Sequence, residues 1–388
     1  MLPIALLLAA LTATARAATI APGPPGNDFY TPPSPLPEQR NGAIVWARAF
    51  SGGAALSSAS TNYRLLYETV AMNGSYVAVS GTLAIPQGVP PPQGWPLISW
   101  AHGTVGDGPQ CAPSRSDAPN GEQRMLDGFV RRGYAVAQTD YEGNGTPGIH
   151  PYMVADAAAR DVTSIVSASR ELDPQIGKTW IVMGHSEGGA AALATAAIGQ
   201  QLAPSLDLAG VVSYAPFLYP ESVLRGELHG DAPNSGMVFL ALLIEGFSTV
   251  DPRVVPADML EPEALRLVPD LLARCVDELM NDSGWSRLVP LSMFRPQGQA
   301  SVEAFYSDLV ANDPVNFPIP VPALLVQGES DSMVSPMVTL ALSDRLRHNG
   351  TPVTIKTYVG ATHGSVLAAS ANDVADWIAR RFAAAAAR

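Results

Sequence analysis

The amino-acid sequence predicts an α/β fold, in which a mostly parallel, doubly wound sheet carries an inserted helical cap. Short, continuous apolar runs alternate with stretches of helical spacing from about residue 93 onward, as in parallel strands that helices cover on both faces. A strong hairpin signal precedes this alternation. Roughly a hundred residues without strand character interrupt it, which is the mark of an insertion.

Five apolar runs are expected to form the parallel strands. They span residues 96–101, 134–139, 180–183, 210–214 and 323–327. Helical spacing predicts the helices over residues 122–132, 155–172, 189–201 and 338–348. An antiparallel pair is expected ahead of them, because residues 63–70 and 76–83 flank the turn dipeptide Asn73-Gly74. Such alternation, with right-handed crossovers, builds a doubly wound sheet.

The chain is expected to divide into four parts. They are a signal peptide (1–17), a Pro-rich arm (18–42), a core (43–216 and 322–388) and a helical cap or lid (217–321). Prolines exclude a helix or a central strand from the arm, which we expect to lie extended over the surface. Helical segments of the cap span residues 237–245, 270–280 and 302–311. We favour a cap over ordinary core helices, because apolar helices without strand partners must bury their faces locally.

The first residues have the pattern of a secretory signal peptide. An apolar run, 4–11, leads to Ala15-Arg16-Ala17, which predicts cleavage after Ala17. No later stretch is long and apolar enough to span a bilayer. We therefore expect an extracellular or periplasmic protein. In an oxidising compartment the two cysteines, Cys111 and Cys275, are expected to form a disulfide, with a buried unpaired pair as the alternative.

Composition excludes several classes of function. Lys plus Arg number 23 against 35 for Asp plus Glu, a formal net charge of −12, which leaves no electrostatic footprint for nucleic acid. Two cysteines are too few for a zinc ribbon or an iron–sulfur cluster. The sequence has no H-E-x-x-H motif, no Walker loop and no dinucleotide-binding glycine loop after a strand. We therefore expect neither a metal nor a cofactor.

A candidate nucleophile lies in the segment Gly184-His185-Ser186-Glu187-Gly188. The segment follows a predicted strand and opens a predicted helix, which is the setting of the G-x-S-x-G nucleophile turn. Ser186 would sit on a strained turn, where side chains at Gly184 and Gly188 would collide with neighbouring backbone. The bland alternative is a Gly-rich turn with an ordinary N-cap serine.

A serine of ordinary pKa needs a base, and in chains with this turn the acid and the base follow the serine in that order. Three of the six histidines precede Ser186, and His229 falls in the predicted cap. His348 ends a predicted helix, where it is better explained as a cation paired with the helix dipole. His363 remains, in a loop of small residues after an expected strand at 353–359.

The acid is expected to be Asp331. It follows the apolar strand that ends at Gln327, so its carboxylate would lie at the carboxyl edge of the sheet, where sites of open α/β sheets are found. Glu329, two residues earlier, is the competitor. A pair of solvated loop carboxylates is the bland alternative.

An oxyanion formed beside Ser186 needs two preorganised N–H donors. One is expected from the backbone of Glu187, which follows the serine. The other is expected from Thr104 in the Gly-rich loop after an earlier strand, with His102 as an orienting group. A tight turn without catalytic meaning is the alternative for this loop.

Together these segments resemble the secretory lipase family, which includes fungal lipase A. The resemblance rests on residues 28–33, 102–104, 111–114, 140–145 and 184–189 and on the loops of Asp331 and His363. It implies an α/β-hydrolase fold with a helical lid, ester hydrolysis without a cofactor, and a disulfide between Cys111 and Cys275. Fungal members can carry a further disulfide, for which this sequence has no cysteines.

The function expected from these residues is hydrolysis of a carboxylic ester, by a lipase or an esterase. Ser186 would attack, His363 would carry the proton and Asp331 would orient His363. The substrate is expected to be a small-molecule or lipid ester, and a transient contact with a lipid interface stays open. A serine peptidase such as an aminopeptidase, or a secreted binding protein without turnover, are the alternatives.

Overall fold

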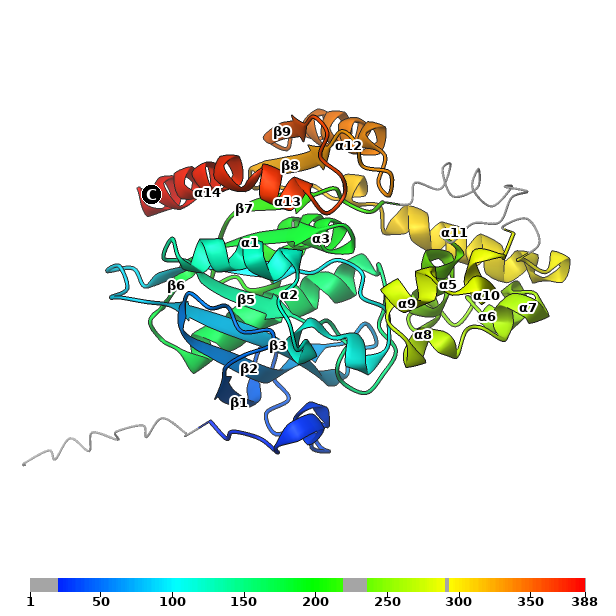
Figure 1. Ribbon diagram of the computed structural model, residues 1–388, viewed down its shortest axis with the longest axis horizontal. Coiled ribbons are helices and arrows are strands. Elements are labelled where there is room, and N and C mark those ends of the chain that lie inside the picture. Colours follow the sequence, from blue (N-terminus) through cyan, green and yellow to red (C-terminus); the bar gives the residue numbers. More distant parts are fainter. Residues whose placement is uncertain (1–19, 219–235, 290–292, 388) are drawn as a thin grey trace, which may run out of the picture.

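A computed structural model describes residues 20–218, 236–289 and 293–387 (Figure 1). The predicted signal peptide and His229 lie outside the described residues. The remainder holds a central sheet, helices on both of its faces, and a group of helices at one end.

The sheet has nine strands in the order β1-β2-β3-β5-β4-β6-β7-β8-β9. Strands β1, β2, β3 and β5 pair antiparallel with their neighbours in that order, and all pairs from β5 onward are parallel. The bounds are β1 (Ile44–Phe50), β2 (Ala59–Val70), β3 (Tyr76–Pro86), β4 (Trp95–Ala101), β5 (Ala135–Thr139), β6 (Ile176–His185), β7 (Asp207–Tyr214), β8 (Ala323–Gly328) and β9 (Val353–Tyr358). The predicted fold class, a mostly parallel α/β sheet, is confirmed.

Helices cover the two faces of the sheet in separate groups. Alternate side chains of a strand point to opposite faces, so Val182 packs with α2, α3 and α12, whereas its neighbour Ile181 packs with α1, α13 and α14. The bounds are α1 (Gly121–Val130), α2 (Ala155–Leu172), α3 (Glu187–Leu202), α12 (Pro336–His348), α13 (Val366–Ala369) and α14 (Ala371–Ala386). This is the doubly wound arrangement that the apolar runs predict.

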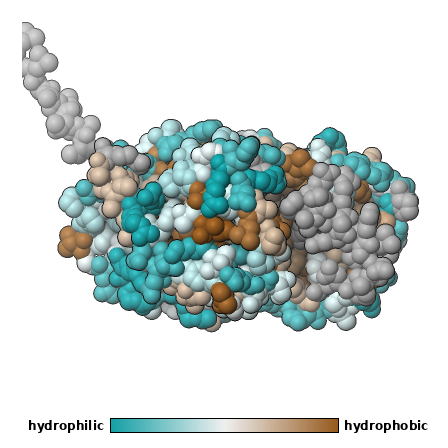
Figure 2. All heavy atoms as spheres, turned by 90° about the horizontal axis from the view of Figure 1, so that it is seen from above, coloured by the Kyte–Doolittle hydropathy of each residue, from teal (hydrophilic) through white to brown (hydrophobic). Residues whose placement is uncertain are grey.

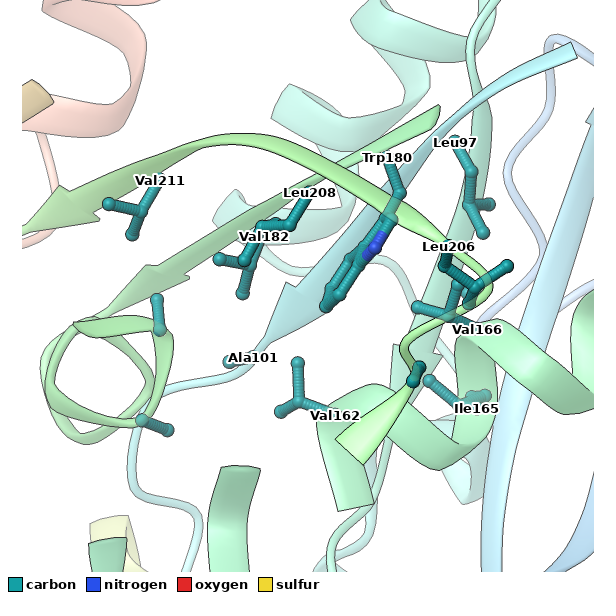
Figure 3. Close-up of a cluster of buried hydrophobic side chains, with 14 of the residues drawn as sticks. Leu97, Ala101, Val162, Ile165, Val166, Trp180, Val182, Leu206, Leu208 and Val211 are labelled. Atoms are coloured by element: carbon teal, nitrogen blue, oxygen red, sulfur yellow. The ribbon is translucent and has the colours of Figure 1, made fainter. Parts of the chain in front are cut away.

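One of the two tryptophans in the apolar cluster around Val182, Trp180, packs β6 against α2. Figure 3 shows its indole pointing from the strand toward Val162 and Ile165 of α2, with Leu206 and Leu208 nearby. Trp180 is only 1% exposed. Its burial removes a large apolar area from water and anchors the strand that carries the candidate nucleophile at its end.

Between β7 and β8 the described chain forms helices that lie together at one end of the molecule (Figure 1). They bury their own apolar cluster, which includes Phe247, Trp285 and Phe305. Their bounds are α5 (Met237–Ser248), α6 (Pro256–Met259), α7 (Pro262–Leu265), α8 (Asp270–Ala273), α9 (Val276–Met280), α10 (Ser283–Ser286) and α11 (Gln299–Ala311). We call this group the cap.

One predicted cap helix is wrong. The segment 270–280 is expected as a single helix, but the structure breaks it into α8 and α9 at Arg274 and Cys275, which have extended backbone angles. The reason is tertiary: Cys275 forms a disulfide with Cys111 of the core, with a Cα–Cα distance of 5.5 Å. The N–H of Val276 also donates to the carbonyl of Val105, at 2.9 Å. These contacts pull the chain out of helical conformation.

The N-terminal arm is not extended throughout. A short 3-10 helix spans Gly26–Tyr30 and buries Phe29 and Tyr30, where the prolines of the arm were expected to exclude any helix. None of the five residues in that helix is a proline, and Pro25 merely precedes it, so its backbone is free to coil. The Tyr30 hydroxyl lies 3.0 Å from the Ser114 hydroxyl and fastens the arm to the core.

The outer surface is mixed in character. Figure 2 shows one face on which hydrophilic residues predominate and hydrophobic residues gather in small patches. Val359 and Met337 are among the large apolar side chains left mostly exposed. Across the described ranges, no helix is long and apolar enough to cross a membrane.

Candidate active site

The carboxyl ends of the parallel strands bring the predicted site residues to one edge of the sheet. Ala101 at the end of β4 pairs with Gly184 of β6, and Tyr214 of β7 pairs with Val326 of β8. The loops that follow β4, β6, β8 and β9 therefore emerge side by side, as expected at the functional edge of an open α/β sheet.

Ser186 lies on a sharp turn between β6 and α3. Its backbone angles, φ 57° and ψ −118°, are in a region that residues with a Cβ rarely adopt, so the turn is strained. Two hydrogen bonds hold it: the Ser186 N–H donates to Tyr214 at 2.9 Å, and the Ser186 carbonyl accepts from Phe217 at 2.9 Å. The strain fits a turn that projects the serine side chain away from the sheet.

The glycines on either side of the turn permit very close packing. A Cβ added at Gly184 would collide with the carbonyl of Gly188, and one added at Gly188 would collide with the carbonyl of Ala101. Both collisions are with backbone, which cannot move aside. The predicted need for glycine at 184 and 188 therefore has a direct steric cause.

Asp331 and His363 lie in contact. The Nδ1 atom of His363 is 2.8 Å from Oδ2 of Asp331, whose side chain is fully buried, while the His363 side chain is 17% exposed. The other carboxylate oxygen, Oδ1, accepts hydrogen bonds from the N–H groups of Met333, at 2.9 Å, and Val334, at 2.8 Å. Burial raises the pKa of Asp331, but the hydrogen bonds from His363 and the backbone outweigh it and hold the pKa below its usual range. An ionised carboxylate therefore faces the imidazole.

The competing candidates for the acid and the base, Glu329 and His348, lie away from the turn at Ser186. Glu329 accepts a hydrogen bond from the exposed Thr357 hydroxyl at 2.8 Å, and its carboxylate points to the surface. His348 is exposed in the last turn of α12, beside Arg345 and Arg347. Neither residue reaches the turn at Ser186.

Ser186 and His363 line one cavity of about 810 Å³, which opens between the core and the cap. Within the described part of the chain, no hydrogen bond joins the Ser186 hydroxyl to the imidazole. The two residues are nevertheless tied through their neighbours, since Nε2 of His185 lies 2.9 Å from the carbonyl of His363. Catalytic hydrogen bonds are often long in unliganded sites and tighten when substrate binds.

Thr104 and Glu187, the two residues expected to donate to an oxyanion, both lie near Ser186. Thr104 lines the same cavity as Ser186, and Glu187 begins α3, so its N–H lies at a helix N-terminus. Among the described residues, neither N–H donates to another group. The Thr104 hydroxyl lies 2.9 Å from that of Tyr152, and Nδ1 of His102 lies 2.7 Å from the carbonyl of Gly103. These contacts fix the loop and leave the N–H of Thr104 available.

The side chain of Glu187 has a buried partner that sequence reasoning missed. Nε2 of His150 lies 2.9 Å from Oε1 of Glu187, and both side chains are almost fully buried. The His150 ring also stacks on Tyr141, with ring centroids 5.3 Å apart. Burial lowers the pKa of His150, but the hydrogen bond and the charge of Glu187 outweigh it and raise the pKa to about 9. No local pattern around His150 signals this contact.

We expect the free energy of unfolding to fall as the pH rises from about 6.5 to about 9. The folded protein keeps the His150 proton across this range, whereas the unfolded chain loses it near its ordinary pKa, so the stabilisation present below that pKa disappears as the pH passes the folded value. The contribution is about 3 kcal/mol, at about 1.4 kcal/mol per pKa unit. Urea midpoints measured across this range test it.

A matched variant separates His150 from other titrating groups. His150→Gln keeps an N–H that can face Glu187 but carries no titrating proton, so its stability should depend less steeply on pH over the same range. Equal slopes for the variant and the parent protein would contradict the assignment.

The disulfide lies at the site. Cys111 and Cys275 line the cavity together with Ser186, so the disulfide ties the cap to the loop that carries Thr104. It agrees with the pairing that the resemblance implies. The described residues contain no group of three or more His, Cys, Asp or Glu side chains placed to hold a metal ion.

The sheet order, the strained serine turn and the loops at the carboxyl edge are those of the α/β-hydrolase fold. A family model described as serine aminopeptidase, S33 matches residues 120–367, well over half of the chain. The chain therefore belongs to this S33 family of hydrolases.

Similar proteins carry lipase and esterase names. A protein named "Probable inactive lipase" from Mycobacterium tuberculosis (strain CDC 1551 / Oshkosh) is 26% identical over 398 residues, which cover 93% of this chain and 82% of that protein. Candida antarctica lipase A has a similar fold, with a TM-score of 0.72 at 16% identity over 86% of this chain and 80% of that one. The rice cell wall degrading esterase LipA from Xanthomonas oryzae gives a TM-score of 0.66 at 19% identity, over 86% and 97% of the chains.

Proposed function

We propose that the protein is a serine hydrolase of carboxylic esters, with Ser186 as nucleophile, His363 as base and Asp331 as the orienting acid. The observation that carries the proposal is the contact between Asp331 and His363, at 2.8 Å, in the same cavity as the strained Ser186 turn. A buried, ionised carboxylate fixes the proton of His363 on Nδ1, so Nε2 is free to accept a proton. This is the arrangement that a neutral serine hydroxyl needs.

The reaction has two halves. In the first, Ser186 Oγ attacks the acyl carbon while its proton passes to His363, and the alcohol then leaves with that proton. In the second, water attacks the acyl-enzyme, His363 accepts the water proton and returns it to Ser186, and the carboxylic acid leaves. The N–H groups of Thr104 and Glu187 stabilise the oxyanion in both halves.

The cap supplies the walls that a sheet edge lacks. A small cavity beside Glu187 is lined mainly by apolar side chains from α2, α3, the cap helices α5 and α11, and the segments before α2 and after β7. They include Met153, Leu218, Leu243, Phe247 and Leu309. We assign this side to the acyl part of the ester, because an apolar wall next to the nucleophile favours a hydrocarbon chain.

A serine aminopeptidase is the second candidate, because that activity names the family that residues 120–367 match. The same three side chains can cleave an amide. A binding protein without turnover is the third, since one relative carries a name that includes the word inactive. We favour the ester hydrolase over the third, because Ser186, Asp331 and His363 are all present.

Hydrolysis of a p-nitrophenyl ester series, compared with amino-acid p-nitroanilides, tests the proposal. We expect turnover of the esters to exceed that of the anilides, and the series with and without emulsified triglyceride separates an esterase from a lipase. A fluorophosphonate probe is expected to label Ser186, as mass spectrometry of the tryptic peptide would show. Faster anilide cleavage would favour the aminopeptidase. If the protein showed no turnover and no labelling, the binding protein would be the remaining candidate.

We also propose that the chain is exported, with cleavage after Ala17. The proposal rests on the apolar run and small residues of the N-terminus. The disulfide between Cys111 and Cys275 supports it, because disulfides persist in oxidising compartments.

A further inference from the structure

A second carboxylate and imidazole lie behind the proposed catalytic residues. Glu122, in the first turn of α1, reaches the turn that precedes Ser186, and its Oε1 lies 3.3 Å from Nδ1 of His185. The side chains of His185 and Glu122 are only 9% and 16% exposed. Their contact crosses 63 positions of the sequence, so it belongs to the tertiary structure of the site.

The Glu122 carboxylate also holds the oxyanion loop. Its Oε1 accepts a hydrogen bond from the N–H of Gly103 at 3.2 Å, next to Thr104. Its Oε2 accepts a hydrogen bond from the indole N–H of Trp100 at 3.2 Å, near the end of β4. One carboxylate thus fixes the segment that precedes the proposed oxyanion donor.

His185 extends the contact to the histidine loop. Its Nε2 lies 2.9 Å from the backbone carbonyl of His363, and the two imidazole rings lie with centroids 4.4 Å apart. His185 is also the residue directly before Ser186. The chain of contacts from Glu122 through His185 therefore joins the serine turn, the oxyanion loop and the loop of His363.

The hydrogen-bond chemistry indicates which atoms carry protons. A backbone carbonyl only accepts, so the Nε2 of His185 donates to His363. Both oxygens of Glu122 accept N–H groups, and burial, which raises the pKa of Glu122, is outweighed by the hydrogen bond and charge of His185, so the pKa lies below its usual range. An ionised carboxylate also accepts, and a hydrogen bond to a charged acceptor is stronger than one between neutral groups.

We propose that Glu122 and His185 are positioning residues, which together hold the oxyanion loop and the His363 loop in register with Ser186. The inference rests on the proposed ester hydrolysis. Neither residue exchanges a proton with substrate. Their effect is on the geometry that Ser186, His363 and the N–H of Thr104 need at the same moment, to which rates are sensitive at the level of about 1 Å.

Kinetics of Glu122→Gln, His185→Gln and the double variant test the proposal. We expect each single variant to lower kcat for p-nitrophenyl acetate about 10- to 100-fold with little change in KM, because a misplacement of about 1 Å in a site can cost about 100-fold in rate. Because the two side chains act through one contact, the double variant should lose no more than the worse single one. Rates are expressed per active site, titrated with a fluorophosphonate probe, so misfolded protein does not count.

Asp127→Asn is the matched control. It removes a carboxylate charge from the same helix, α1, where Asp127 contacts Arg131 and accepts hydrogen bonds from Ser58, away from the Ser186 cavity. Its turnover per active site should equal that of the parent protein. Losses that simply multiply in the Glu122/His185 double variant, or a rise in KM with kcat unchanged, would overturn the proposal.

The parent protein separates this inference from the proposed function. If it turns over no ester but is labelled at Ser186, the rate of labelling replaces kcat as the readout, with the same expected pattern among the variants. If it neither turns over esters nor reacts with the probe, the ester-hydrolase proposal fails, and the positioning role fails with it.

Discussion

The Ser186→Ala variant is expected to lose roughly 10⁵- to 10⁶-fold in kcat for p-nitrophenyl ester hydrolysis. Without the hydroxyl no acyl-enzyme forms, and the residual rate comes from the oxyanion donors acting on water. The fold should persist, because the hydrogen bonds to Tyr214 and Phe217 are made by the backbone of residue 186 and alanine keeps the same Cβ. Initial rates from the longest practical assay measure the residual turnover, and far-UV circular dichroism shows whether the fold persists.

Ser332→Ala serves as the control for this loss. Ser332 is an exposed serine in the loop of Asp331, so it shares the residue type and the neighbourhood but not the strained turn. Its turnover should match the parent protein. A Ser186→Ala protein that retains turnover within tenfold of the parent would remove Ser186 as nucleophile and, with it, the proposed mechanism.

The sheet could be predicted from the sequence because strands that are buried on both faces are apolar along most of their length. Runs such as 323–327 are apolar without alternation, since alternate side chains enter two different cores, and β8 spans Ala323–Gly328. The positions of Ser186, Asp331 and His363 could be predicted as well, because each follows a segment that the sequence predicts to be a strand.

Contacts between residues far apart in the sequence, such as that of Glu122 with His185, are not indicated by any local sequence pattern. Nothing around Glu122 distinguishes it from any acidic residue in the first turn of a helix, where the helix dipole alone explains a carboxylate. Its partner His185 stands at the variable position of G-x-S-x-G, where the motif asks for no particular side chain. Only the packing of α1 beside the end of β6 brings the two together.

The prediction of one cap helix was wrong for a related reason. Residues 270–280 have helical spacing, but the disulfide at Cys275 and the backbone hydrogen bond between Val276 and Val105 take the chain out of its local preference. The break lies at the wall of the Ser186 cavity. Departures from local preference are expected where function fixes the geometry.

The Asp331→Asn variant is expected to lose about 10⁴-fold in kcat, although it is nearly the same size and shape. Two backbone N–H groups, of Met333 and Val334, point at Oδ1, so the amide oxygen of asparagine must take that position. Its NH₂ group then faces Nδ1 of His363, which can only accept from it. The imidazole proton moves to Nε2, and the ring can no longer take the proton of Ser186.

Glu329→Gln is the control for this variant and decides between the two carboxylates of the loop. Glu329 contacts Thr357 at the surface, so its neutralisation should leave kcat unchanged, and urea midpoints of both variants show whether either loss comes from unfolding. A large loss in Glu329→Gln with an active Asp331→Asn would transfer the acid's role to Glu329. We expect instead that Asp331→Asn loses activity and Glu329→Gln keeps it, because Asp331 is the carboxylate in contact with His363, at 2.8 Å. The N–H groups of Met333 and Val334 allow the asparagine amide in Asp331→Asn only one orientation.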